Sequence, residues 1–363
     1  MKAQQRINRQ KVIVIIGIWT LIGGFLSLYD HWAFISHLSE GGSEDYSFLS
    51  NLAFNMFAGL IGGAMGGVFL VYYFNRKFRS TPYLKSIIAV SLAFVTIVTI
   101  ITFLMSTLQA GIENGFNFSD PITIERMKEL VLTTQHLKNI LFWAFIVALT
   151  QFTLLVNDKF GQGLLWSIVR GKYTFPQTEE RIFMFLDLKS STSIAEQLGN
   201  LDYHKLLKDI FSDITDPILN HKGEIYQYVG DEVVISWKFL DGVEKSNCIE
   251  CYFDIRRQLY SLRGKYEQDY GLMPEFKAGI HYGNVVAGEI GIIKRDITYS
   301  GDVLNTTARI QGMCNEFGVN LLSSKKLLDK LTVHNGFAIK TMGAIPLRGK
   351  ELSEELIAVE QAV

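Results

Sequence analysis

The chain has 363 residues, enough for two domains, and 48% of them are hydrophobic, a high share for a wholly soluble protein. The formal net charge is −1, so the composition gives no basis for nucleic-acid binding. Three cysteines are an odd number, which excludes a complete disulfide framework and suits a reducing compartment.

The apolar residues are concentrated at the start of the chain, in four stretches near the roughly 20 residues that cross a bilayer as a helix. We therefore expect residues 1–157 to form an α-helical four-span membrane bundle in contact with lipid. The predicted spans are residues 12–29, 50–74, 85–107 and 139–157.

The charges between these stretches predict their orientation. The N-terminal segment and the segment between spans two and three carry basic residues without acids, whereas residues 30–49 carry acids without Lys or Arg. Positive charges stay on the cytoplasmic side of a membrane. We therefore expect a multi-pass protein of the cell membrane, with its N-terminus and the domain after span four in the cytoplasm.

Two features of residues 1–157 each allow two interpretations. Gly59, Gly63 and Gly67 recur at four-residue spacing, which suits either a dimerisation face or close packing inside the bundle. Three histidines near the predicted outer surface suit either a ligand site or simple tolerance at an interface: His31, His37 and His136.

Residues 158–180 follow as a predicted connector. Leu164, Leu165, Ile168 and Val169 have helical spacing, and Pro176 ends any helix. A connector of this kind either transmits a change in the spans to the next domain or serves as a spacer.

Residues 181–363 predict a cytoplasmic domain of mixed α/β type. A buried strand is expected at 181–187, and β-rich runs at 224–230 and 232–237 predict a hairpin around Gly230-Asp231. Residues 276–288 are expected to form a strand, a turn and a second strand. Helices are expected at 190–199, 203–218, 244–268 and 302–316, and further strands at 319–323, 337–347 and 355–360.

Two acids in this pattern predict metal chemistry. Asp187 ends one predicted strand and Asp231 lies at the tip of the hairpin, so the carboxylates converge if those strands are neighbours. Ser190, Ser191 and Thr192 then open a helix, whose N–H groups suit phosphate oxygens while the acids suit Mg²⁺. Taken alone, Asp231 suits an ordinary turn equally well.

Four motifs in order make the combination specific. FLDLKSST, YQYVGDEVV, KAGIHYGNVVAGEIG and YSGDVLNTTARI together resemble the class III adenylate/guanylate cyclase catalytic domain over about residues 180–360. The resemblance implies a ferredoxin-like, palm-type α/β fold and the conversion of a nucleoside triphosphate to a 3′,5′-cyclic nucleotide and pyrophosphate. It also implies a homodimer with two shared sites, each using two Mg²⁺ or Mn²⁺ ions.

The resemblance assigns roles to individual positions. Asp187 and Asp231 match the metal-binding aspartates, and the carbonyl of Leu188 matches a further metal contact. Asn305 matches the asparagine that orients the ribose, and Arg309 the arginine that stabilises charge on the α-phosphate. Two further positions are implied: Lys350 matches the phosphate-binding lysine, and Thr298 falls where the family reads the purine.

The sequence leaves open whether the substrate's base is adenine or guanine. Adenylate cyclases usually carry a lysine, and guanylate cyclases a glutamate, at the position of Gln227. A glutamine amide both donates and accepts, so Gln227 suits either purine, while Thr298 favours ATP. The resemblance thus predicts an adenylate cyclase, with a guanylate cyclase as the alternative.

Two other functions are less compatible with the sequence. A diguanylate cyclase would need a GG-D/E-E-F hairpin, but Val229 precedes Gly230. A catalytically silent membrane nucleotide sensor would not need the intact metal, ribose and phosphate positions. Cys248 and Cys251 are spaced C-x₂-C in a predicted helix with no second pair, so we expect reduced structural cysteines.

Overall fold

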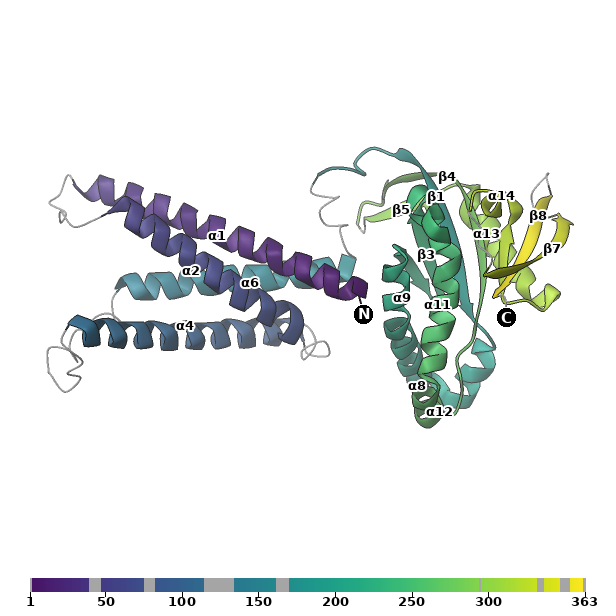
Figure 1. Cartoon of the computed structure of the whole chain (residues 1–363), viewed down its shortest axis with the longest axis horizontal. Coiled ribbons are helices and arrows are strands. Elements are labelled where there is room, and N and C mark those ends of the chain that lie inside the picture. The colour runs from purple at the N-terminus through teal and green to yellow at the C-terminus, as the bar shows by residue number, and fades with distance from the viewer. Residues whose placement is uncertain are drawn as a thin grey trace. The chain divides into compact units, whose positions relative to one another are not determined.

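The structure is a computed structural model, in which the chain forms two compact units, residues 6–165 and residues 166–363 together with 1–5. The first unit is helical and the second is a mixed α/β domain (Figure 1). The residues described are 2–38, 47–74, 82–113, 134–160, 170–293, 295–331, 336–346 and 353–361. The predicted helical part of the connector, and Lys350, lie outside them.

Helices cover all four predicted spans. Three of them contain stretches long and apolar enough to cross a membrane, namely Gln4–Ile35, Asn51–Tyr73 and Leu137–Lys159, while the apolar stretch found in the fourth, Leu84–Ile97, is shorter. The helices are α1 (Lys2–Leu38), α2 (Phe48–Val68) continuing as the π-helix η1 (Phe69–Phe74), α4 (Tyr83–Glu113) and α6 (Thr134–Phe160).

Trp19 of α1 lies at the centre of the helical unit, where only 1% of it is exposed. Its indole Nε1 donates to Thr150 Oγ1 of α6 at 3.0 Å, which satisfies the polar atom of a buried ring. The ring also packs edge-on against Phe94 of α4 and beside Trp143 of α6. One side chain therefore joins three helices.

The glycine stripe of α2 packs inside this unit. A Cβ on Gly59 would lie 2.4 Å from the carbonyl oxygen of Trp19, and one on Gly63 would lie 2.9 Å from the Cα of Ile16. On the facing helix α1, a Cβ on Gly23 would lie 2.2 Å from the carbonyl oxygen of Asn55 of α2. The small residues let α1 and α2 approach closely, so packing within the bundle is the correct one of the two interpretations.

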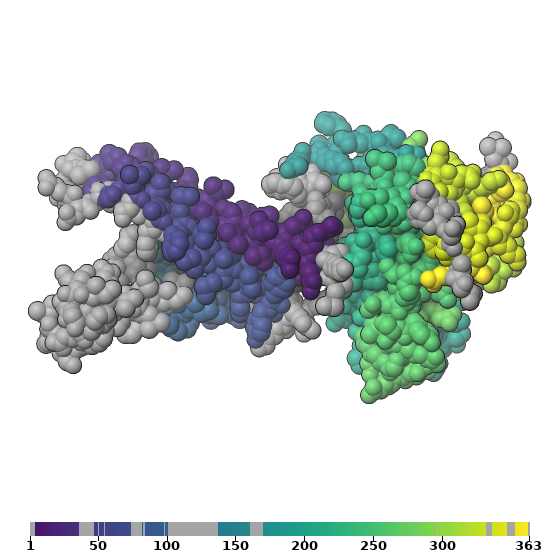
Figure 2. Space-filling model, in the orientation of Figure 1, coloured from purple at the N-terminus to yellow at the C-terminus, as the bar shows by residue number. Residues whose placement is uncertain are grey.

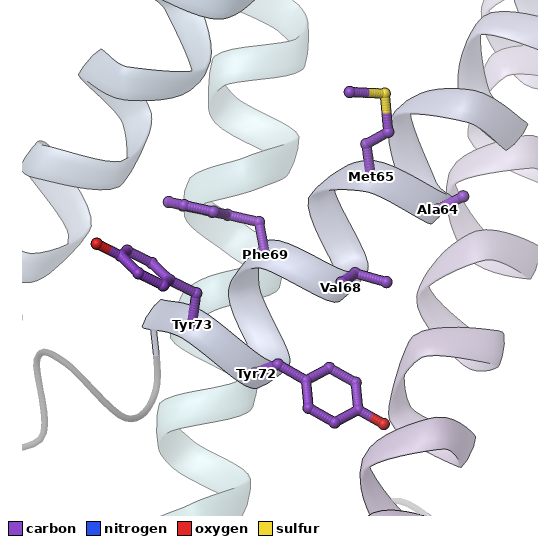
Figure 3. A pocket seen from close by; sticks show the side chains of 6 residues that line it. All are labelled: Ala64, Met65, Val68, Phe69, Tyr72 and Tyr73. Atoms are coloured by element: carbon purple, nitrogen blue, oxygen red, sulfur yellow. The ribbon is translucent and has the colours of Figure 1, made fainter.

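The surface of the helical unit has a shallow apolar depression on α2 and η1 (Figure 3). It contains no charged side chain. Its lining is Ala64, Met65, Val68, Phe69, Tyr72 and Tyr73. Of the three histidines considered as ligands, His31 packs its ring against Phe48, with 4.5 Å between the centroids.

In its described residues, the second unit has an eight-stranded sheet in the order β2-β3-β1-β4-β6-β8-β7, with β5 paired to β4 alone. In the described part of the chain, the strand pairings are antiparallel except that of β4 with β6. The C-terminal strands β7 and β8 gather at one end of the unit, yellow in the space-filling view (Figure 2). The strands are β1 (Gln177–Leu188), β2 (Glu224–Val229), β3 (Glu232–Lys238), β4 (Phe276–Ile290), β5 (Asp296–Ser300), β6 (Leu321–Ser324), β7 (Phe337–Ile345) and β8 (Glu354–Gln361).

The two faces of the sheet are covered differently. Ile182, Met184 and Leu186 of β1 join the main core with α8, α9 and α11, because alternate strand residues share a face. Phe183 and Phe185 lie on the other face, under β5 and the start of α13. The helices of this unit are α8 (Ser191–Asp213), α9 (Thr215–Asn220), α10 (Phe239–Val243), η2 (Glu244–Ser246), α11 (Asn247–Ser261), α12 (Arg263–Tyr270), α13 (Asp302–Phe317) and α14 (Lys325–Leu328).

One predicted segment is wrong in detail. Residues 276–290 form the single strand β4 rather than two strands and a turn, and the turn comes later, before β5, which the sequence reading missed. The predicted hairpin at 224–237 and the helix near 302–316 are present. Cys248, Cys251 and Cys314 are buried and free.

Candidate active site

The hairpin of β2 and β3 carries Asp231 at its tip. Gly230 has a φ of 62°, the left-handed conformation that glycine adopts without steric cost, so the chain turns within two residues. Asp231 directly precedes β3 and is therefore held at the end of the strand rather than in a long loop.

Asp187 lies at the same end of the neighbouring strand. It pairs in register with Glu232, the residue after Asp231, because β1 and β3 are adjacent and antiparallel. Three carboxyl groups thus meet at one edge of the sheet. Burial raises the pKa of Glu232 to about 7, and the charges of Asp187 and Asp231 add to the shift. Burial also raises the pKa of Asp187, with Lys277 opposing the rise and Asp231 adding to it.

Two further side chains hold Asp187, and both contact the same carboxylate oxygen. Lys277 Nζ of β4 lies 3.1 Å from Oδ2, and Gln311 Nε2 of α13 donates to Oδ2 at 3.0 Å. Neither contact involves Oδ1 of Asp187. The pair of donors therefore restrains the rotamer of Asp187.

The donor set is compatible with Mg²⁺ or Mn²⁺. Among the described residues no group of three His, Cys, Asp or Glu side chains is spaced to hold a metal unaided. Mg²⁺ does not need such a cage, because it binds one or two carboxylates and completes its shell with waters and substrate phosphates. Asp187 and Asp231 would supply those carboxylates, and the carbonyl of Leu188 is a neighbouring oxygen.

The start of α8 follows Asp187 directly. Ser190 precedes the helix in the left-handed conformation with a φ of 56°, and its side chain makes no capping hydrogen bond. Ser191 hydrogen-bonds Tyr203, and burial together with the charge of Asp231 raises the pKa of that phenol. Ser190 and Thr192 are exposed, and the binding of phosphate by the three hydroxyl residues stays a prediction.

The residues expected to bind base and ribose lie on other elements. Gln227 pairs with Val234 and Val234 with Phe185, so it lies on the same sheet face as Asp187, one row away. Thr298 lies on β5 with its hydroxyl oxygen buried, and among the residues described this oxygen has no hydrogen-bond partner.

Asn305 and Arg309 are four residues apart on α13, so they share one side of that helix. Arg309 Nη1 is buried and has no hydrogen-bond partner in the described part of the chain. Gln311, which contacts Asp187, lies about 160° around the helix from Arg309 at 3.6 residues per turn. The metal-binding candidates and the arginine of one chain therefore lie on opposite sides of α13.

Four residues of this site were not found from the sequence: Glu232, Lys277, Gln311 and Tyr203. Glu232 was visible in the motif GDE, but the others become neighbours of the aspartates only through strand register and helix packing. Lys277 and Gln311 each reach Asp187 from an element distant in sequence. The predicted Lys350 cannot be placed, because it lies outside the described residues.

Residues 174–359 match the family model described as the adenylate and guanylate cyclase catalytic domain. Adenylate cyclase 2 of Rhizobium meliloti (strain 1021) is 41% identical over 180 residues, which are 50% of this chain and 50% of that protein. The adenylate cyclase of Anabaena cylindrica is 25% identical over 181 residues, 48% of this chain and 35% of that protein.

Solved structures agree on the fold. A bacterial light-regulated adenylyl cyclase has a TM-score of 0.54 and 22% identity, and the match covers 63% of this chain and 67% of that one. The chain spans half or less of the length of these two curated relatives. Because the family model covers just over half of the residues, the chain belongs to the adenylate and guanylate cyclase catalytic domain family.

Proposed function

We propose that the chain is a membrane-bound adenylate cyclase that converts ATP to 3′,5′-cyclic AMP and pyrophosphate. The observation that carries this proposal is the meeting of Asp187 and Asp231 at one sheet edge, with Asp187 held through a single oxygen. The 41% identical relative named as an adenylate cyclase supports the choice of reaction.

The reaction joins the ribose 3′-oxygen to the α-phosphorus and breaks the bond to pyrophosphate. Divalent metal ions bound by Asp187 and Asp231 would supply positive charge at the attacking and leaving oxygens. Arg309 would donate two parallel hydrogen bonds to the α-phosphate as its charge grows, and Asn305 would orient the ribose. Lys350 would hold the leaving phosphates as a compact cation.

A homodimer is part of the proposal, and the geometry of α13 supports it. Gln311 faces Asp187 of its own chain, whereas Arg309 and Asn305 are turned away on the other side of the helix. One chain would thus contribute the metal-binding carboxylates of a site, and the partner would contribute the arginine and asparagine.

The identity of the substrate's purine base is less constrained by the site than the binding of metal is. Gln227 would lie at the purine edge, and its amide matches the donor and acceptor pattern of either base. Conversion of GTP to cyclic GMP is therefore the second candidate, because Gln227 stands in place of the lysine that adenylate cyclases usually carry.

We also infer that the helical unit spans the cell membrane. Lys11 pairs with Asp158 and Lys138 pairs with Asp30, each at 2.7 Å, and no charged residue lies between the pairs on either helix. With a rise of about 1.5 Å per residue, the two pairs lie about 30 Å apart along α1 and along α6. That distance equals the hydrocarbon thickness of a typical bilayer, about 30 Å.

The purified full chain should form cyclic AMP from ATP with Mg²⁺ or Mn²⁺. Replacing Asp187 with Ala should lower the rate by at least about a hundredfold, because a metal-binding carboxylate is lost. Asp269→Ala, the same change at an exposed position of α12, should leave the rate unchanged. Absence of any cyclic product from ATP and GTP would refute the proposed function, and an active Asp187→Ala chain would refute the metal assignment.

A further inference from the structure

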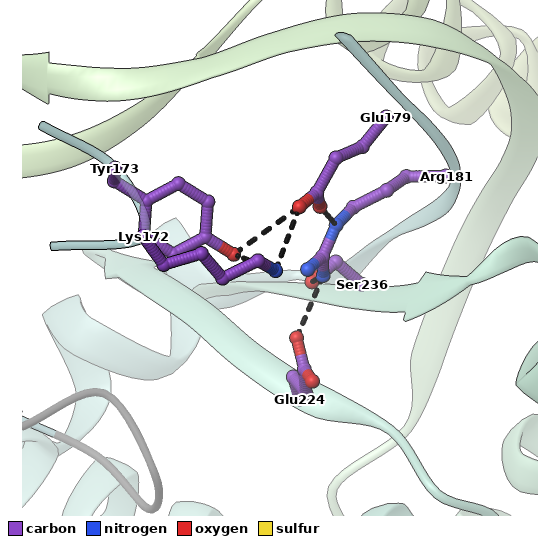
Figure 4. A network of polar contacts seen from close by, with 6 residues as sticks. All are labelled: Lys172, Tyr173, Glu179, Arg181, Glu224 and Ser236. Carbon is purple, nitrogen blue, oxygen red and sulfur yellow. Dashed lines mark hydrogen bonds and ion pairs between the residues drawn. The ribbon is translucent and has the colours of Figure 1, made fainter. Parts of the chain in front are cut away.

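Arg181 of β1 is a buried cation that the proposed chemistry does not use. Only 1% of the residue is exposed. Its Nε donates to Glu179 at 2.8 Å, and its Nη1 donates to Glu224 at 2.6 Å and to Ser236 at 3.3 Å (Figure 4). Glu179 also accepts from Lys172 at 2.9 Å, so the network begins in the segment that precedes β1. Two carboxylates offset the cost of burying the guanidinium.

The guanidinium also lies against the ring of Tyr299 on β5. Its Cζ is 4.7 Å from the ring centroid, within the range of a cation–π contact. Tyr299 in turn packs against Tyr226 of β2, with centroids 5.0 Å apart, and its backbone N–H donates to the hydroxyl of Tyr226 at 3.4 Å. We call Arg181, Tyr299 and Tyr226 the tyrosine stack.

The tyrosine stack matters because β5 has little backbone pairing to hold it in place. Among the described residues, β5 forms strand pairs with β4 alone. Its contact with β2 comes from Tyr299, and side chains on a strand alternate, so Thr298 lies on the opposite side of β5 from this anchor. On β2 the register shifts between Ile225 and Gln227, which makes Tyr226 the bulged residue, and a bulge re-aims the side chains beside it.

Each residue expected to read the purine is therefore the chain neighbour of one tyrosine of the stack. Thr298 precedes Tyr299, and Gln227 follows Tyr226. Resting on the function proposed above, we propose that the tyrosine stack fixes the spacing between Thr298 and Gln227 and so determines which purine the site accepts. Arg181, Tyr226 and Tyr299 are then positioning residues, since they act through their neighbours.

The experiment measures base selectivity in the full chain. Tyr226→Phe keeps the ring and removes the hydrogen bond to Tyr299, and Arg181→Lys keeps the charge and removes the planar contact. Both variants should raise the KM for the preferred nucleotide, about threefold to tenfold for Tyr226→Phe, with kcat within about twofold. The ratio of kcat/KM between ATP and GTP should move toward one.

Three controls separate positioning from general damage. Tyr252→Phe removes a buried hydroxyl that donates to Phe276 O at 3.0 Å on the other sheet face, and should leave the ratio unchanged. Lys172→Met removes the hydrogen bond from Lys172 to Glu179 and should also leave the ratio unchanged. Inhibition by pyrophosphate, which has no base, should be equal in wild type and all variants.

The outcomes are distinguishable. An unchanged ATP-to-GTP ratio in Tyr226→Phe and Arg181→Lys would overturn the proposal and leave the cyclase function standing. A parallel loss of pyrophosphate inhibition would also overturn it, because the damage would then reach beyond the base. If Arg181→Lys fails to fold, Tyr226→Phe decides. If the wild type forms no product, the proposed function fails, and equilibrium binding of ATP and GTP to the same variants still measures the ratio.

Discussion

Gly279 of β4 lies directly under helix α13. A Cβ at this position would be 2.3 Å from the backbone nitrogen of Gln311 and 2.6 Å from its Cα, distances that real side chains do not adopt. The clash is with backbone rather than with the end of a side chain, so it cannot be relieved by a change of rotamer. Gly279 therefore sets the distance between α13 and the sheet, and this distance allows Gln311 to contact Asp187.

Gly279→Ala should lower the free energy of unfolding by about 2 to 3 kcal/mol, because overpacking forces the helix to move. It should also lower cyclase activity more than ordinary destabilisation would, since α13 carries Asn305 and Arg309. Urea unfolding and activity at a temperature well below the midpoint measure the two effects.

Gly312→Ala is the matched control on the same helix. Nothing lies within 4 Å of a Cβ there, and the residue is exposed. A helix gains up to about 1 kcal/mol when alanine replaces glycine, so this variant should be as stable as wild type or slightly more stable. Equal effects of the two substitutions would contradict the close contact at Gly279.

At this scale the sequence predicted the residues whose signal is local. Asp231 follows a glycine between two β-rich runs, and that pattern alone marks a hairpin tip. The contact of Gln311 with Asp187 joins residues 124 positions apart, and no periodicity links them. Lys277 and Tyr203 were missed for the same reason, because only the register and the packing bring them to the aspartates.

Among the elements, β4 shows that glycines within a strand can lead to the prediction of a turn that is absent. The segment GIHYGNVVAG contains three glycines, which suggested a turn between two strands. In the structure the strand runs through all of them, and each gives room to a neighbour: α13 at Gly279, Val303 at Gly283 and Pro176 at Gly288. β5 was missed because it is short, although its sequence DITYS alternates polar and apolar side chains.

The helices of the first unit permit a direct test of the membrane proposal. The three native cysteines are buried, and burial raises the pKa of each thiol, so they should react poorly with maleimides. A membrane-impermeant maleimide added to intact cells should therefore label Ser47→Cys, between α1 and α2, and not Ser261→Cys on α11. Both positions are exposed in the folded chain.

Permeabilised cells provide the control, because both cysteines should then be labelled. Labelling of Ser261→Cys in intact cells would contradict the cytoplasmic placement of the α/β unit. Release of the chain from membranes by alkaline carbonate would contradict the spans themselves.

For the whole molecule, the central claim is that one active site is assembled from two copies of the chain. Gln311, which contacts Asp187, and Arg309 lie about 160° apart around α13, which supports a site that takes Asp187 and Arg309 from different copies. In a symmetric dimer the same surfaces recur, and two equivalent sites result. The order of the motifs suggested this arrangement through family resemblance, and the helix geometry is its support in this chain.

The most direct test combines two inactive chains. Asp187→Ala and Arg309→Ala, each expressed alone, should be inactive, because every site in either homodimer lacks one of the two groups. Co-expression with different tags, followed by purification through both tags, isolates the heterodimer. One of its two sites then has both residues, so we expect about half of the wild-type activity. A heterodimer no more active than its parents would contradict the shared site.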